Sequence, residues 1–233
     1  MSEWWTYRLS SFLLFSPRTY YRLFELYNSE IWPGQVVALL VGLAMLVLVR
    51  NGGPWQSRVV AAALSTSWLW VAWAYHYARY ASINWAATYF AGAFAVEALL
   101  LLGCGVVKGL HLRPRDGLIG SAGIGLVVFA LLVHPLIGPL VGRSWSQVEI
   151  FAIAPDPTVV ATLGVLVLTS GPSTRLLLPI PVLWCLVSGA TAWTMHSADA
   201  ALMPVAAAFA LAVRGGLPSE PDGSPRGPAP HGP

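Results

Sequence analysis

Charged side chains are scarce in this sequence, and their scarcity excludes an ordinary soluble domain. Only 10% of the 233 residues are Asp, Glu, Lys or Arg, whereas soluble domains have about 25%. Lysine occurs once, at Lys108. Because 56% of the residues are hydrophobic, the composition predicts an integral membrane protein whose main partner is the lipid bilayer. The formal net charge of +3 is spread thinly over segment ends and does not indicate a nucleic-acid partner.

Several catalytic and cofactor motifs are also absent. Neither a Walker loop nor a GxSxG elbow occurs, so no ATP-driven mechanism is encoded and no nucleophile–base pair stands out. No HxxxH or HExxH spacing is present. The two cysteines, Cys104 and Cys185, lie in separate apolar segments without a CxxC motif, and we expect them to be core residues. We therefore expect a protein that is not an enzyme and has no metal site and no cofactor.

Seven apolar segments predict an all-α, polytopic transmembrane bundle of about seven spans. The fifth and seventh segments have only 14 residues each, which is short for a span. Pro179 and Pro181 are expected to kink the sixth segment. The segments are residues 31–49, 59–77, 82–107, 117–142, 158–171, 176–195 and 200–213.

The composition divides the chain into three parts. Residues 1–30 combine many aromatic side chains with arginine, which predicts an amphipathic arm lying at the membrane interface and broken near Pro17; an ordered arm packed on the bundle is the alternative. Residues 31–214 form the transmembrane bundle. Residues 215–233 are rich in proline and glycine and are expected to be disordered. No cleaved signal peptide is expected.

The distribution of Arg and Lys predicts the orientation in the membrane. With seven spans, eight basic residues lie on the side of the C-terminus and five on the other side. Because basic loops remain in the cytoplasm, we expect a cytoplasmic C-terminus.

Glu97 is the most informative residue. Residues 82–107 contain no other charged side chain, and a charge at the centre of a membrane helix costs about 2.5–3.5 kcal/mol. Such a residue usually faces the protein interior or a wet cavity, so Glu97 is a candidate binding residue. The alternative is a hydrogen bond to a neighbouring helix.

Four other polar residues are predicted near the outer boundary, given a rise of about 1.5 Å per helical residue. They are His76, His134, Asn84 and Asp156, and together with Glu97 they would form the mouth and floor of a cavity for a cation, proton or small polar solute. A structural role is the alternative for each: His76 in an aromatic belt, His134 bonded to a carbonyl freed by Pro135, and Asp156 as a helix cap. Capping is likewise expected for Asp116 and Asp199, and a plain loop position for His196.

Three stretches together resemble a known family. They are residues 1–28, reading MSEWWTYRLSSFLLFSPRTYYRLFELYN; HPLIG at 134–138 with APDPT at 154–158; and PVLW at 181–184 leading to Asp199. They are similar to an uncharacterised family of bacterial multi-pass inner-membrane proteins, a domain of unknown function often labelled as MFS permeases. This chain has His134 where that pattern usually has Tyr, and Asp156 where it usually has Cys. The resemblance implies an inner-membrane location and supplies no activity.

Two hypotheses for the function follow. The first is a small permease for a solute, proton or cation, with Glu97 as the intramembrane polar site. The second is a non-catalytic accessory or scaffolding subunit that binds a membrane-protein partner or a second copy of itself through its aromatic arm.

Overall fold

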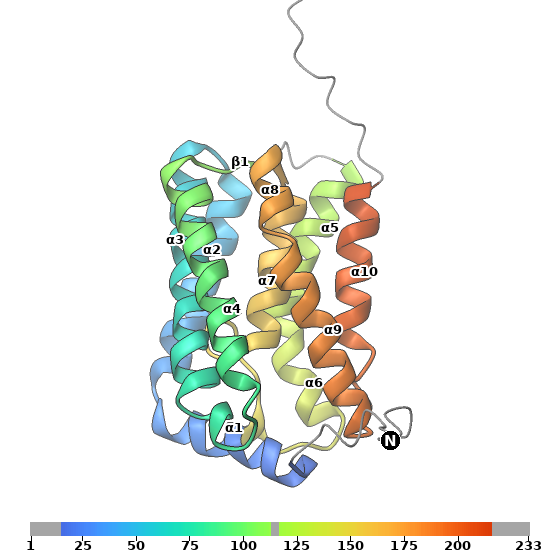
Figure 1. Ribbon diagram of the computed structural model, residues 1–233. Coiled ribbons are helices and arrows are strands. Elements are labelled where there is room, and N and C mark those ends of the chain that lie inside the picture. The colour runs from blue at the N-terminus through green and yellow to red at the C-terminus, as the bar shows by residue number, and fades with distance from the viewer. Residues whose placement is uncertain (1–14, 113–116, 216–233) are drawn as a thin grey trace, which may run out of the picture.

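In the computed structural model, which describes residues 15–112 and 117–215, the chain folds into a bundle of helices packed side by side (Figure 1). The all-α prediction is confirmed for these residues. Their only strands are β1 (His111–Leu112) and β2 (Thr169–Ser170), which pair antiparallel at one end of the bundle. The opposite end carries α1 (Pro17–Glu30) and α6 (His134–Leu140).

The remaining helices connect these two ends. A break at Leu177 and Leu178 separates α8 (Pro172–Leu176) from α9 (Pro179–Thr194). Pro179 and Pro181 lie in the first turn of α9, so the sixth segment is interrupted before the prolines and not kinked at them. The other helical elements are α2 (Gly34–Asn51), α3 (Pro54–Trp70), η3 (Val71–Tyr77), η4 (Tyr80–Ser82), α4 (Ala87–Leu100), η5 (Leu101–Val107), α5 (Gly117–Val128), η6 (Phe129–Val133), η7 (Trp145–Gln147), α7 (Pro155–Val167), α8 (Pro172–Leu176), α9 (Pro179–Thr194) and α10 (Leu202–Gly215).

Four helices in the described residues are long and apolar enough to cross a membrane. Two of the remaining predicted spans correspond to the short helices α7 and α10, and a third corresponds to α3 with η3, which is helical but not among the four. The full number of about seven spans therefore remains a prediction. The four helices are Gly34–Asn51, Ala87–Val107, Gly117–Leu140 and Pro172–Thr194.

The short helix α7 forms the centre of the bundle. Twelve of its 13 residues are buried, and it contacts α5, α9, α10 and α3. A helix of this length is about 20 Å long, shorter than the bilayer core of about 30 Å. A helix that is apolar on all sides is stable when other helices surround it. The shortness of this segment thus reflects a core position.

Close packing of α5 against α7 depends on two small residues. A Cβ atom at Gly164 would lie 2.8 Å from the backbone oxygen of Gly123, and a Cβ at Gly123 would lie 2.9 Å from the oxygen of Gly164. Small residues thus allow the two helix backbones to approach closely at this crossing. Gly125 does not contribute, because an added Cβ there would meet nothing within 4 Å.

The described part of the aromatic arm packs on the bundle. Helix α1 begins at Pro17, where Ser16 accepts a hydrogen bond from the backbone of Thr19. The hydroxyl of Tyr27 donates to the Ile153 carbonyl at 3.3 Å and accepts from Trp70 Nε1 at 2.9 Å. These contacts place α1 across the end of the bundle (Figure 1). Residues 1–14 of the predicted arm, Asp116 and residues 216–233 of the tail lie outside the described residues.

Candidate functional site

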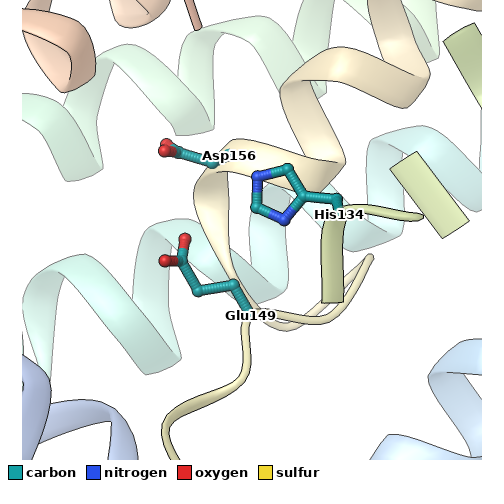
Figure 2. A group of neighbouring side chains, drawn as sticks. All are labelled: His134, Glu149 and Asp156. Atoms are coloured by element: carbon teal, nitrogen blue, oxygen red, sulfur yellow. The ribbon is translucent and has the colours of Figure 1, made fainter. Parts of the chain in front are cut away.

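Five titratable side chains gather inside the end of the bundle where α1 lies. His134 opens α6, Arg143 and Glu149 belong to the connector between α6 and α7, Asp156 lies in the first turn of α7, and Asp199 precedes α10. Figure 2 shows the imidazole of His134 between the two carboxyl groups of Glu149 and Asp156. We call these five residues the polar cluster.

The connector is bent so that its charged side chains point inward. After α6 the chain turns at Gly142, whose φ of 87° is accessible to glycine at little cost, and the backbone N–H of Arg143 donates to the Gly138 carbonyl at 2.9 Å. Closer to α7, the Thr158 hydroxyl accepts from the backbone of Ala152 at 2.9 Å and donates to the carbonyl of Ala154 at 2.7 Å. These local bonds fix the path that brings Glu149 beneath α7.

Arg143 is the cation of the polar cluster. Its guanidinium forms an ion pair with Asp199 and a longer one with Glu149, with an N–O distance of 3.4 Å. It also lies over the ring of Tyr21 at 4.9 Å. The side chain is only 12% exposed, and a buried guanidinium requires such acceptors and aromatic contacts. Asp199 also accepts a hydrogen bond from Ser197.

Asp156 is oriented by two donors on α9. Its Oδ1 accepts from Trp184 Nε1 at 2.7 Å, and its Oδ2 accepts from the Ser188 hydroxyl at 2.6 Å. The prediction that Asp156 caps α7 is wrong, because the helix begins one residue earlier at Pro155 and no side chain caps it. Asp199 is not at the N-cap position of α10 either, because α10 begins three residues later at Leu202, and its carboxylate pairs with Arg143.

His134 is 7% exposed, and its Nδ1 is buried without a hydrogen-bond partner in the described part of the chain. The imidazole also interacts with the backbone of Glu149. The nearest ligand atoms of His134, Glu149 and Asp156 all lie within 4.8 Å of one another. A buried unpaired nitrogen is costly, and the ring that carries it lies beside two carboxyl groups.

The electrostatic environment favours a proton on Glu149 in the absence of another cation. Burial, followed by the nearby carboxylate of Asp156, raises the pKa of Glu149 from 4.5 to about 8, although Arg143 opposes this shift. Burial also raises the pKa of Asp156, and the hydrogen bonds from Ser188 and Trp184 oppose that shift.

A small cavity of about 30 Å³ lies among these side chains. Its lining comes from α1, α6, the connector, α7, α9 and α10, and it includes all five residues of the polar cluster. A space of this size holds about one water molecule or one ion. The cluster can therefore bind a small cation or exchange a proton.

The other predicted site residues do not join the polar cluster. Glu97 is fully buried, and neither of its carboxyl oxygens has a hydrogen-bond partner within residues 15–112 and 117–215. It faces the interior, as predicted, but it does not line the cavity. His76 is fully buried among aromatic rings, including Phe94 at 4.5 Å and Trp184 at 4.9 Å between ring centroids.

Asn84 and His196 have local positions. The Asn84 Oδ1 accepts from the backbone of Ala86 at 3.1 Å in the turn before α4, a common role for asparagine. His196 is exposed in the loop after α9, as the plain-loop alternative predicts. Of the five predicted binding residues, the structure thus brings together only His134 and Asp156.

Sequence reasoning missed Arg143 and Glu149 as site residues. The available signal was their position: an arginine and a glutamate six residues apart in a connector between two apolar segments. Charges in connectors are usually solvated, so sequence alone did not separate these two from ordinary loop residues. The expectation for Cys104 and Cys185 is confirmed, since both are free and buried.

Comparison with known proteins identifies a family without indicating an activity. No curated protein and no solved structure matches the chain. Residues 18–215 match the model of DUF6064, a family of unknown function, and the chain belongs to this family.

Proposed function

We propose that this protein is a multi-pass protein of the bacterial inner membrane, a small permease that passes a cation, proton or small polar solute without ATP. The polar cluster is its binding site, and Glu97 is a second polar position deeper in the bundle. The observation that carries the proposal is the convergence of five titratable side chains on one small cavity inside an otherwise apolar bundle. Ionisable residues inside membrane bundles commonly mark ion and proton pathways.

The position of the polar cluster supports a role as the point where an ion enters the bundle, in addition to any role in holding the helices together. It lies at the end of the bundle beneath α1, whereas Glu97 is 10 residues beyond the start of α4, about 15 Å further along the helix. An ion entering at the cluster would next meet the carboxyl group of Glu97. The C-terminus is then on the cytoplasmic side and α1 on the outer side, as the basic residues predict.

The test is flux into proteoliposomes of purified wild-type protein, Asp156→Asn and Glu97→Gln, with protein-free vesicles as the blank. We expect proton or cation flux in the wild type and at least about a tenfold loss in Asp156→Asn. Equal flux in wild type and Glu97→Gln would remove the deeper residue from the pathway. Equal flux in wild type and Asp156→Asn would remove the cluster.

A specific surface feature favours the accessory-subunit alternative. A groove of about 820 Å³ opens between α2 and α3, and small and aliphatic side chains such as Val37, Ala62 and Ala63 dominate its lining. A partner helix could occupy it, since small residues allow close approach. This alternative predicts no flux with any ion, wild-type function for Glu97→Gln, and loss of partner binding when residues 1–30 are removed.

A further inference from the structure

The three residues His134, Glu149 and Asp156 have the composition of a metal site. They offer one imidazole nitrogen and two carboxylates, and their ligand atoms lie within 4.8 Å of one another. In a closed site around a first-row metal ion, neighbouring ligand atoms are about 3–4.5 Å apart. Side-chain rotations that move the ligand atoms by about 1 Å would therefore allow all three to coordinate one ion. Figure 2 shows the three side chains converging from α6, the connector and α7.

The buried imidazole is the second observation that points to a ligand. Most buried ring nitrogens have a hydrogen-bond partner, but His134 Nδ1 has none in the described residues. His134 is 7% exposed and lines the cavity of about 30 Å³, which is large enough for one ion or one water molecule. A bound metal ion would occupy that space and be coordinated by the imidazole.

The charges around the cavity also match a divalent ion. Three carboxylates (Glu149, Asp156 and Asp199) and the single guanidinium of Arg143 line it, giving a net charge of −2 when all are ionised. A net charge of this size buried in an apolar bundle is unfavourable without compensation. One divalent cation neutralises it.

Two of the three proposed ligands accept hydrogen bonds from neighbouring side chains, as the ligands in metal sites commonly do. Trp184 and Ser188 each donate a hydrogen bond to one oxygen of Asp156, and Arg143 contacts Glu149. Each carboxylate oxygen has two lone pairs and can accept a hydrogen bond while it coordinates a metal. Such partners orient ligands and are a regular feature of metal sites.

We propose that His134, Glu149 and Asp156 bind one divalent first-row transition metal ion, such as Mn²⁺ or Zn²⁺, with the cavity supplying space for a water ligand. The mixed nitrogen and oxygen donors favour these ions over Mg²⁺ and Ca²⁺, which prefer oxygen ligands. The proposal departs from the sequence-based expectation of no metal site, which rested on the absence of short spacing motifs. If the protein is the proposed permease, this ion is its solute. Binding of the ion does not depend on the proposed function, whereas its transport does.

The first experiment measures equilibrium binding to the purified full chain in detergent after removal of metals with EDTA. Titration with Mn²⁺, followed by electron paramagnetic resonance, is expected to show about one tight site per chain. His134→Gln is expected to weaken binding at least about tenfold. The matched control is His196→Gln, which removes an exposed histidine and should bind as the wild type does. Absence of a stoichiometric site, or unchanged binding in His134→Gln, would overturn the proposal.

The second measurement needs no variant, which protects the test if His134→Gln does not fold. Electron spin echo spectroscopy of wild-type protein with bound Mn²⁺ is expected to detect the nitrogen of a coordinated imidazole. Bound Mn²⁺ without nitrogen coupling would overturn the assignment.

Flux measurements separate this proposal from the proposed function. Metal binding without flux of Mn²⁺, Zn²⁺, protons or other solutes would support the site and refute the permease. Flux of protons or other solutes in a protein that fails to bind either metal would support the permease and refute the site.

Discussion

The two groups of buried polar residues differ in how their polar atoms are satisfied. In the polar cluster, Arg143 pairs with two carboxylates and Asp156 accepts two hydrogen bonds, while His134 Nδ1 and Arg143 Nε have no partner in the described residues. On α3–η3 and α4, His76 and Glu97 are fully buried, and neither has a hydrogen-bond partner for its side chain in the described segments. Burial alone is thus a poor guide to a site, because only the first group combines burial with convergent partners and a cavity.

The largest effect is expected when the polar cluster loses its cation. Arg143→Met leaves three carboxyl groups buried without a positive charge, and we expect a loss of about 3–5 kcal/mol in the free energy of unfolding. Chemical unfolding in detergent micelles measures this. Arg22→Met is the control, because Arg22 is 58% exposed and its ion pair with Glu25 lies within α1, and exposed pairs contribute at most about 1 kcal/mol. Equal effects of the two substitutions would mean that the cluster is not a buried network.

The opposite sign is expected for the isolated carboxyl group. Glu97→Met replaces a buried polar group without partners by an apolar one of similar length, which should stabilise the bundle by about 1–3 kcal/mol. The same unfolding assay measures the change. Destabilisation would show that Glu97 has a partner, such as a bound water molecule or ion.

The pH dependence of stability depends on Glu149. Because its pKa rises from 4.5 to about 8 on folding, the folded protein holds a proton that the unfolded chain releases between these values. The contribution of Glu149 to stability is therefore fully present below about pH 4.5 and is lost as pH rises to about 8, by at most about 1.4 kcal/mol per pH unit. Unfolding of the EDTA-treated protein across this range measures the slope. Glu149→Gln should reduce it, and an equal slope in the variant would assign the proton to another group.

The smallest effect is expected for Asn84, a predicted site residue that lies outside the polar cluster. Asn84→Ala removes hydrogen bonds to the Ala86 backbone and the Tyr80 side chain before α4 and should cost about 1 kcal/mol, without changing Mn²⁺ affinity. Parallel unfolding and Mn²⁺ titration test both parts. A change in affinity comparable to that of His134→Gln would extend the site to this turn.

Much of the fold could be predicted from local patterns. Long apolar stretches correspond to Gly34–Asn51, Ala87–Val107, Gly117–Leu140 and Pro172–Thr194, because helix formation and hydropathy depend on neighbours a few residues apart. The inward position of Glu97 was predictable for the same reason. The burial of α7 on all sides was not, because a short apolar segment is compatible with a core helix, a re-entrant segment or part of a span.

The site was only partly predictable. Depth along each helix placed His134 and Asp156 at one end of the bundle, but it also placed His76 and Asn84 there, and these two turned out to have other surroundings. Depth fixes the position along a helix axis, whereas contact also requires the right rotation about that axis. Glu149 and Arg143 belong to a connector whose path has no periodicity that could be read in advance.

The sequence by itself determined the helical class of the chain, the approximate limits of its long helices and the presence of a carboxyl group, Glu97, inside one of them. These features follow from composition and short-range pattern. Only the tertiary structure decided that His134 and Asp199, 65 residues apart, line one cavity with Arg143, Glu149 and Asp156. Their meeting depends on how the helices rotate and pack around α7 and on the bends of the connector. These are properties of the whole bundle, because close packing allows few relative orientations of its helices.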